Sequence, residues 1–505
     1  MPSKAATAWA IAAIALAVFA RVAWLPQKPF WRDEAWVASR VEAPLRELAG
    51  PQPLPIPIGF VAVTKLARAL PVSPEVAYRL LPLAAGIALI PLLGRLACAL
   101  GAAPAVALAA MWLAAGLPPL INYARELKAY EIDALYAVLA PLLALHLFAS
   151  AAERRPGART AAAGPLLVLS LTAAPWISFG ALFPVAAALV WGWLAPWRRA
   201  APGARRWWIA ASAAYAASFA MALYLSVGAQ STNLEVQRFW RTGMYRDEVD
   251  SQWVQAGEAV WNYLRLPLQF ALPRGWGIAA GVALLGAIVW PRRHRRLLAW
   301  MYAGSGVAAI AAALADCYVL ASGRLLLFAL PPVLLAAAAG LHWIAARLWP
   351  ARDRALAVGA AAVLALTWTW PAVAWRVQPY RNDVGNYFRY DILHDVDAIL
   401  ARAEAVVPAG APVYIGENAS RPFAYYGRGR FLRAAVCIEP CNFAAAVDEW
   451  LAGLDQRGWM ILVSDEQYLY TDHLAARGFT PRVRARARGV HLWEVSRDGE
   501  ADAAR

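Results

Sequence analysis

The first 36 residues decide the fold: the apolar run ATAWAIAAIALAVFARVAW (residues 6–24) is followed directly by LPQKPFWRDEAW (residues 25–36). A helix that spans a bilayer needs about 20 apolar residues, and this run has that length. A secretory signal would show a shorter apolar core and a small-residue cleavage site, so the run predicts a retained first membrane helix. The chain then places Arg32, Asp33 and Glu34 beside aromatic residues immediately after the membrane.

The composition of the whole chain agrees with a membrane protein. Of its 505 residues, 61% are hydrophobic and 16% are charged, whereas about a quarter are charged in a soluble domain. The net charge is +15, but nucleic-acid binding would need a basic face or a known motif. The arginines cluster instead between apolar runs, so we expect membrane lipids and no nucleic acid among the partners.

Apolar runs of spanning length recur along the chain and predict an α-helical polytopic membrane protein with about eleven transmembrane helices. These runs lie near residues 6–24, 77–97, 103–121, 131–150, 161–175, 177–195, 207–227, 276–291, 297–316, 322–346 and 355–376.

Arginine clusters between the predicted helices orient the chain. Positive charge marks the cytoplasmic side of a membrane, and all four clusters fall on that side if the N-terminus is cytoplasmic. The clusters are Arg154/Arg155/Arg159, Arg198/Arg199/Arg205/Arg206, Arg292/Arg293/Arg295/Arg296 and Arg347/Arg352/Arg354.

This orientation places four segments outside: residues 25–76, 122–130, 228–275 and everything after 376. Within the first of them, Ile58–Leu70 is apolar, shorter than a span and basic, so we interpret it as a helix lying at the membrane interface. The alternative, an eccentric short span, would break the charge alternation of the later segments.

Residues 1–376 are therefore predicted to form the membrane domain, and residues 377–505 a small periplasmic α/β domain. Its expected elements alternate, which favours a largely parallel sheet. The expected strands are 411–418, 458–466 and 489–496, and the expected helices are 391–407 and 442–454. Cys437 and Cys441 enclose Pro440 and could form a local disulfide in an oxidising compartment, or remain two free thiols.

The two carboxylates after the first span have two interpretations. Asp33 and Glu34 could be the N-cap and first-turn acid of an interfacial helix, DEAWVASRVEAPLREL (residues 33–48), because acids stabilise the positive end of a helix. They could instead perform chemistry, since a site that moves a proton needs a carboxylate.

The second outer segment favours chemistry. NYARELKAYEID (residues 122–133) is dense in charge for so apolar a chain, although an ordinary solvated turn between helices is the alternative. A site that handles an anion needs cations, and proton transfer needs an acid. The candidates in this segment are Arg125, Glu126, Lys128, Tyr130, Glu131 and Asp133.

Arg324 begins a late apolar span. Its side chain could extend to lipid headgroups, or it could point inward at a buried phosphate. The histidines show no metal-binding spacing. Carboxylates, cations and aromatic residues beside lipid suit transfer of a group from a membrane-borne phosphate carrier. Phe30, Trp31 and Trp36 could line a sugar or prenyl pocket, although interfacial Trp is also common.

These residues resemble a known family. FWRDEAW (30–36) is similar to the acidic first-loop motif of GT-C glycosyltransferases that use polyprenyl-phosphate sugars. The most similar branch contains the bacterial protein mannosyltransferase-like and lipid A aminoarabinose transferase-like enzymes. EVAYRLLPLAAGIALIPLLGRLA (75–97), YARELKAYEIDAL (123–135) and SGRLLLFALPPVLL (322–335) resemble later motifs of that branch, in the same order.

The resemblance implies a GT-C-like fold in a bacterial inner membrane, with the active site facing the periplasm. It implies transfer of a sugar from a polyprenyl-phosphate donor to a lipid, glycan or protein acceptor of the envelope. Carried over by position, Asp33 and Glu34 would be catalytic, and the donor phosphate would contact Arg125, Lys128, Tyr130 and Arg324. The remaining substrate contacts would be Arg32, Trp36, Asp133, Arg79 and Lys65.

The chain departs from the family in one segment. PLPIPIG (53–59) lacks a Glu-Lys pair that some relatives carry, for which Lys65 is the candidate substitute. This departure puts a divalent cation, Mg²⁺ or Mn²⁺, in question as a cofactor.

Two other classes of function compete with an enzyme. A transporter or flippase of lipid-linked sugars would normally show inverted repeats and broken helices near the midplane, whereas the charges of this chain gather at one face. A non-catalytic envelope assembly protein would not need the pair Asp33–Glu34.

Overall fold

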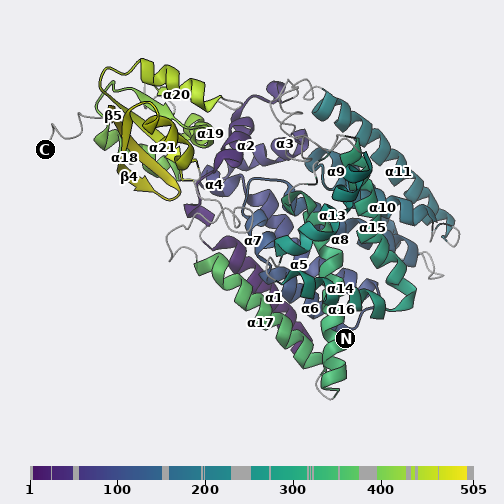
Figure 1. The fold of residues 1–505 in the computed structure, drawn as a ribbon. Helices are drawn as coiled ribbons and strands as arrows, with labels where there is room; N and C mark the ends of the chain where they lie inside the picture. The colour runs from purple at the N-terminus through teal and green to yellow at the C-terminus, as the bar shows by residue number, and fades with distance from the viewer. Residues whose placement is uncertain are drawn as a thin grey trace. The chain divides into compact units, whose positions relative to one another are not determined.

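The chain forms two compact units, which are described separately (Figure 1). The first contains Met1–Ala23, Pro44–Leu70 and Arg79–Val373, and the second contains Trp24–Ala43, Pro71–Tyr78 and Ala374–Arg505. Two segments of the predicted first outer loop thus belong to the unit of the C-terminal residues. The computed structural model describes residues 4–23, 25–48, 56–150, 158–194, 197, 200–228, 252–271, 275–315, 318, 320, 323–350, 353–374, 395–427, 434–437, 442–464 and 466–497.

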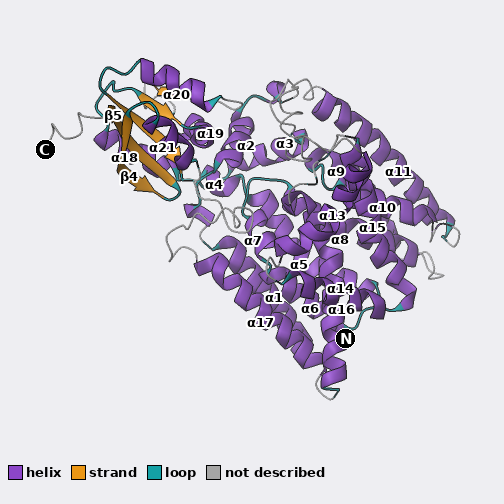
Figure 2. Cartoon of the chain, in the orientation of Figure 1, coloured by secondary structure: helices purple, strands orange, loops and turns teal. Residues whose placement is uncertain are grey.

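The described residues of the first unit are helical (Figure 2). The helices are α1 (Lys4–Val22), η2 (Leu45–Glu47), α3 (Ile58–Leu66), η3 (Ala67–Ala69), α5 (Leu80–Ala99), α6 (Pro104–Gly116), α7 (Pro118–Ala124), α8 (Tyr130–Ser150), α9 (Ala158–Ile177), α10 (Leu182–Leu194), α11 (Pro202–Ala222), η5 (Leu223–Gly228), α13 (Gln252–Ala271), α14 (Trp276–Val289), α15 (Arg292–Leu314), η6 (Gly323–Ala329), α16 (Leu330–Leu348) and α17 (Asp353–Ala374).

The predicted spans all coincide with helices, which confirms a polytopic helical membrane protein. Among the described residues, 6 helices are long and apolar enough to cross a bilayer, and the pair α6–α7, bent by 59°, makes up to 7. The apolar stretches within α9, α10, α14 and α17 are shorter. The bend falls at Leu117, which is extended because the following residue, Pro118, disfavours the helical conformation before it.

Small residues let the membrane helices approach closely. A Cβ atom built on Gly286 of α14 would lie 1.7 Å from the Ala336 carbonyl oxygen of α16, and one on Gly340 would lie 2.1 Å from the Val282 carbonyl. Helices in lipid associate largely through such close packing, because the hydrophobic effect does not drive them together among apolar acyl chains.

Two loop predictions can be compared with the structure. The predicted interfacial helix Ile58–Leu70 is confirmed as a helical segment, formed by α3 and η3. The predicted polar loop 228–275 is wrong for residues 252–271, which form α13 and pack on α15 and η6. Residues 229–251 and 272–274 lie outside the described part of the chain.

The second unit contains a five-stranded mixed sheet, as Figure 2 shows. Its strand order is β2-β1-β3-β5-β4; the first three strands are parallel, and β5 is antiparallel to both of its neighbours. The predicted α/β class is confirmed, but a largely parallel sheet is wrong. The elements are η1 (Leu25–Gln27), α2 (Arg32–Glu42), α4 (Pro74–Ala77), α18 (Val396–Val406), β1 (Val413–Ile415), α19 (Glu417–Tyr426), β2 (Ala434–Val436), α20 (Phe443–Ala452), β3 (Arg457–Val463), α21 (Gln467–Ala475), β4 (Phe479–Ala487) and β5 (Val490–Arg497).

Alternation along the strands builds a core on each face of this sheet. On one face Met460 and Leu462 of β3 pack with residues of α20 and α21, and on the other Ile461 and Val463 pack with residues of α18 and α19. Successive strand side chains point to opposite faces, so a strand buried on both sides reads as a continuous apolar run.

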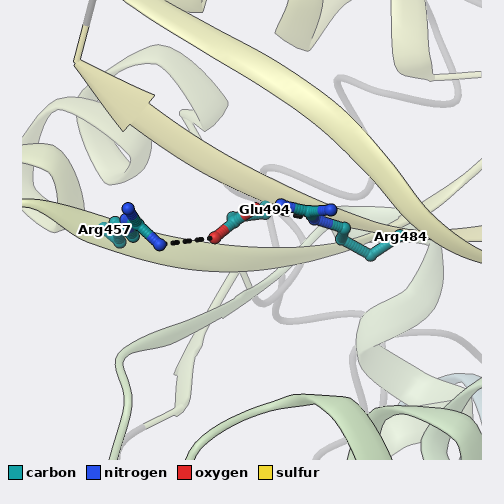
Figure 3. A network of polar contacts seen from close by, with 3 residues as sticks. All are labelled: Arg457, Arg484 and Glu494. Atoms are coloured by element: carbon teal, nitrogen blue, oxygen red, sulfur yellow. Dashed lines mark hydrogen bonds and ion pairs between the residues drawn. The ribbon is translucent and has the colours of Figure 1, made fainter. Parts of the chain in front are cut away.

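Strand β4 escaped prediction because arginine occupies every second position of VRARA (483–487), although this alternation is itself a strand pattern. The register of β4 and β3 against β5 is supported by Glu494, which accepts a hydrogen bond from Arg484 Nε at 2.7 Å and lies 3.5 Å from Arg457 Nη1 (Figure 3). The predicted strand 411–418 was too long, because Glu417 already begins α19.

Cys437, which follows β2, is buried and disulfide-bonded. Its predicted partner, Cys441, lies outside the described residues, so the pairing stays a prediction.

The environment of His491 in β5 predicts that the stability of the second unit depends on pH. Burial and the nearby Arg486 lower the pKa of His491 below its ordinary value of about 6.5. His491 therefore binds a proton more readily in the unfolded chain than in the folded one. The stability that is present above pH 6.5 is lost as the pH falls toward the pKa of His491 in the folded protein. We expect the melting temperature to fall between pH 7.5 and 5.5, and to fall less in His491→Gln. Equal falls in both proteins would contradict this role.

Candidate functional site

The charged segment between α7 and α8 is buried inside the first unit rather than solvated. Arg125, which ends α7, is 1% exposed, and Glu126 is 3% exposed. Lys128 is half-buried in the turn that leads into α8. The alternative of a solvated turn is therefore wrong for Arg125 and Glu126. Burying a charged residue inside a membrane protein is costly, so such residues usually have a function.

Arg324 lies at this segment. Its guanidinium carbon is 5.9 Å from the ring centroid of Tyr130, which begins α8, and η6 packs along α8. Tyr130 also packs edge-on against Tyr123 of α7, with centroids 5.4 Å apart. The structure thus brings together two predicted phosphate ligands, Tyr130 and Arg324, from positions almost 200 residues apart in sequence.

Asp133 lies one turn further along α8 and is held by protein groups. The Ser178 hydroxyl, in the break between α9 and α10, donates a hydrogen bond to the Asp133 carboxylate. A Cβ atom on Gly180 would lie 2.3 Å from Asp133 Oδ2, so the break has room for the carboxylate only because residue 180 is glycine. This geometry favours an anchoring role for Asp133 over the predicted substrate contact.

A buried arginine, Arg21 of α1, and a buried carboxyl group, that of Glu131 of α8, lie in the same unit. A Cβ atom on Gly86 would lie 3.0 Å from Glu131 Oε1 and 3.1 Å from Arg21 Nε, so both side chains reach the bare backbone of α5. Among the described residues, no donor bonds the Glu131 carboxylate. Arg21 was not among the predicted site residues, although a lone arginine inside the first apolar run was a visible signal.

Arg21 also explains how the bent span is tolerated. Its guanidinium donates to the Ala114 carbonyl at 3.1 Å and to the Ala115 carbonyl at 3.0 Å. In an α-helix these carbonyls would accept from residues 118 and 119, which are prolines without an N–H. The arginine therefore supplies the donors that the prolines lack.

The other two predicted substrate contacts of the first unit lie on different elements. Arg79 is fully buried and is the N-cap residue of α5, which packs on α7 and α8. Lys65 lies in the last turn of α3, which packs on α9.

In the second unit, Asp33 and Glu34 occupy the first turn of α2. The N-cap is Trp31 rather than Asp33, and the Glu34 carboxylate accepts from the Trp31 backbone N–H at 3.5 Å. Glu34 is buried, whereas Asp33 is half-buried. The predicted helix 33–48 is too long, because α2 ends before Pro44. Glu34 therefore serves the helix end, and Asp33 is the more open carboxylate.

The predicted substrate contacts Arg32 and Trp36 both face helix α19. The Arg32 guanidinium donates to the Asn418 side-chain oxygen and lies 4.0 Å from Glu417 Oε1. The Arg421 guanidinium carbon lies 5.7 Å from the Trp36 ring centroid.

Phe30 is enclosed by tyrosines and does not line an open pocket. It is fully buried, with ring centroids 6.1 Å from Tyr78, 5.4 Å from Tyr425 and 6.4 Å from Tyr426. The prediction that Phe30 contacts a sugar or prenyl group is not supported by this packing.

The candidate divalent cation finds no ready ligand set. Among the described residues, no group of three or more His, Cys, Asp or Glu side chains comes together.

Comparison of the whole chain with known proteins gives matches in structure alone. No family model matches the sequence, and no curated protein is significantly similar to it. The structure is similar to ArnT from Cupriavidus metallidurans bound to undecaprenyl phosphate, with 14% identity and a TM-score of 0.55 over 97% of this chain and 98% of that one. The apo state of ArnT matches over the same shares, with 14% identity and a TM-score of 0.54.

A weaker similarity extends to the oligosaccharyltransferase AglB from Archaeoglobus fulgidus in complex with an inhibitory peptide and a dolichol-phosphate. The identity is 10% and the TM-score 0.48, over 98% of this chain and 74% of that one. The similarity to ArnT shows the fold, and it confirms the GT-C-like architecture predicted from the sequence.

Proposed function

We propose that this chain, which has the GT-C fold of ArnT, is a membrane glycosyltransferase that transfers a sugar from a polyprenyl-phosphate donor to an envelope lipid, glycan or protein. The observation that carries this proposal is the approach of Arg324 to Tyr130, which follows the segment that contains the buried Arg125 and the half-buried Lys128. A buried or half-buried cationic group beside aromatic rings suits a phosphate on a lipid. ArnT, the similar structure, was solved with such a lipid bound.

The proposed cations act on the leaving group. An acceptor hydroxyl or amine attacks the anomeric carbon of the sugar, and the bond from that carbon to the phosphate oxygen breaks. Negative charge grows on the polyprenyl phosphate as it leaves. Fixed donors aimed at the position where charge develops stabilise the transition state more than the substrate.

Asp33 is the proposed proton acceptor. As the new bond forms, the acceptor loses its proton to the Asp33 carboxylate, which completes the exchange without another reactant. The Glu34 carboxylate accepts a hydrogen bond from the Trp31 N–H, so its role is to stabilise this turn and not to react.

The side of the membrane is also part of the proposal. Arginine clusters between spans are placed in the cytoplasm, and the acidic loop and the C-terminal residues then face the periplasm of a bacterial inner membrane.

The phosphate group can be tested by binding. Arg324→Ala is expected to weaken binding of undecaprenyl phosphate about tenfold or more, because a charged hydrogen-bonding partner typically contributes about 1.5–3 kcal/mol. The lipid that co-purifies can be identified by native mass spectrometry, and affinity measured by titration in detergent.

The matched control is Arg206→Ala, which removes an exposed arginine from the first turn of α11. It should leave the affinity unchanged. If both variants bind undecaprenyl phosphate like the wild type, Arg324 only reaches lipid headgroups and the proposed phosphate site is wrong.

A further inference from the structure

Helix α2, which carries Asp33, is too short to be stable alone. It has 11 residues, and isolated helices shorter than about 12–15 residues are marginal in water. Its position must therefore come from the elements that pack on it. In the second unit α2 packs on α19, more than 370 residues later in the chain.

The start of α19 meets the start of α2. Asn418 and Glu417 lie in the first turn of α19, and both approach the guanidinium of Arg32, the residue directly before Asp33. Arg421, one turn further, lies over the ring of Trp36. Arg32 is thus engaged by protein groups on the residue next to the proposed base.

The end of α19 contacts the chain at both ends of α2. The Tyr426 hydroxyl accepts from the Phe30 backbone N–H at 2.9 Å and donates to Glu75 Oε1 at 3.1 Å. The Tyr425 hydroxyl donates to Glu42 Oε1, at the last residue of α2, at 3.0 Å. Contacts therefore exist before the helix begins and where it ends.

The first turn of α19 is itself fixed to the sheet. The Glu466 carboxylate accepts from the Asn418 N–H at 3.2 Å and from the Val463 N–H, at the end of β3, at 3.1 Å. A Cβ atom on Gly416 would lie 2.5 Å from Glu466 Oε1, so the turn before α19 leaves no freedom there. The segment of α19 that contacts α2 is thus anchored to the packed sheet.

From these contacts we infer that α19 positions the catalytic turn: Asn418, through Arg32, and Tyr426, through the Phe30 N–H, hold Asp33 in its reactive place. This inference rests on the proposed function of Asp33. The C-terminal α/β residues then take part in catalysis without touching substrate, and Arg32 is a positioning residue rather than a substrate ligand.

Tyr426→Phe removes one hydroxyl and keeps the ring. We expect kcat to fall about 2–10-fold, the usual contribution of one hydrogen bond, here that from the Phe30 N–H, with the KM for the lipid donor unchanged. Hydrogen exchange of the α2 backbone amides should become faster. The matched control is Tyr468→Phe on α21, whose side chain is 65% exposed, and it should change neither quantity.

Asn418→Ala, Arg32→Ala and the double variant separate positioning from substrate binding. If the two residues act through their mutual contact, all three proteins lose kcat by a similar factor. If Arg32 instead binds substrate, Asn418→Ala keeps the wild-type rate, and the inference is overturned.

The outcomes remain distinguishable from failure of the proposed function. Unchanged exchange of α2 in Tyr426→Phe overturns the inference whatever the activity. Faster exchange with an unchanged kcat overturns it as well, because α2 is then held for stability alone. Transfer retained by Asp33→Asn would overturn the proposed function, independently of α19.

Discussion

Replacing Asp33 with asparagine is expected to lower the rate of sugar transfer about 10²–10⁴-fold, the usual contribution of a positioned general base. Asparagine fills the same place in the first turn of α2 but cannot accept a proton. The rate is measured in membranes that contain equal amounts of each protein and a labelled polyprenyl-phosphate sugar. Binding of the donor should be nearly unchanged, because the proposed phosphate contacts lie on other residues.

Asp397→Asn is the matched control, since Asp397 is also an acid in the first turn of a helix of the second unit. It reproduces the loss of a charge at a helix end and should keep the wild-type rate. Transfer by Asp33→Asn within a few-fold of wild type would exclude the role of base, and would favour an envelope assembly protein.

The membrane part of the fold was predictable because lipid imposes a simple rule. A span must be long, apolar and helical, so hydropathy located the helices of the predicted spans, although it missed α13. What hydropathy could not foresee is a local effect such as the bend at Leu117. The sequence shows Pro118 and Pro119, but a bent span is acceptable only if a distant side chain satisfies the freed carbonyls.

The C-terminal sheet was predicted in class but not in pairing. Buried strands β1 and β3 have continuous apolar runs, whereas β4 is half exposed and rich in arginine. The antiparallel half of the sheet depends on contacts between strands, including those of Glu494, and such contacts have no local sequence pattern.

The candidate site was predicted in part for the same reason. The density of charge at residues 125–133 and the arginine at 324 were visible locally, and the structure brings Tyr130 and Arg324 together. The hydrogen bond from Arg32 to Asn418 joins residues 386 positions apart, and nothing in the segment FWRDEAW predicts it. Local patterns locate charged groups, but only the fold determines whether another protein group already forms a hydrogen bond or ion pair with them.

Arg21→Met is expected to destabilise the first unit by about 2–6 kcal/mol, because it leaves two buried carbonyls without a donor, and a buried acceptor left unsatisfied typically costs about 1–3 kcal/mol. The change removes both donors from the Ala114 and Ala115 carbonyls and also takes the nearby cation away from the buried Glu131 carboxyl group. Stability is measured by unfolding in mixed detergent micelles. Arg95→Met, at an exposed position of α5, is the control and should cost less than about 0.5 kcal/mol.

The double variant Arg21→Met/Glu131→Gln divides this loss between its two causes. Glutamine cannot ionise, so the second change removes whatever cost arises from burying Glu131 without the nearby arginine. It cannot restore donors to the two carbonyls, which Pro118 and Pro119 leave without their helical partners. We therefore expect the double variant to recover only part of the lost stability. Full recovery would mean that the carbonyl contacts of Arg21 contribute nothing, and no recovery would mean that Arg21 does not act on Glu131.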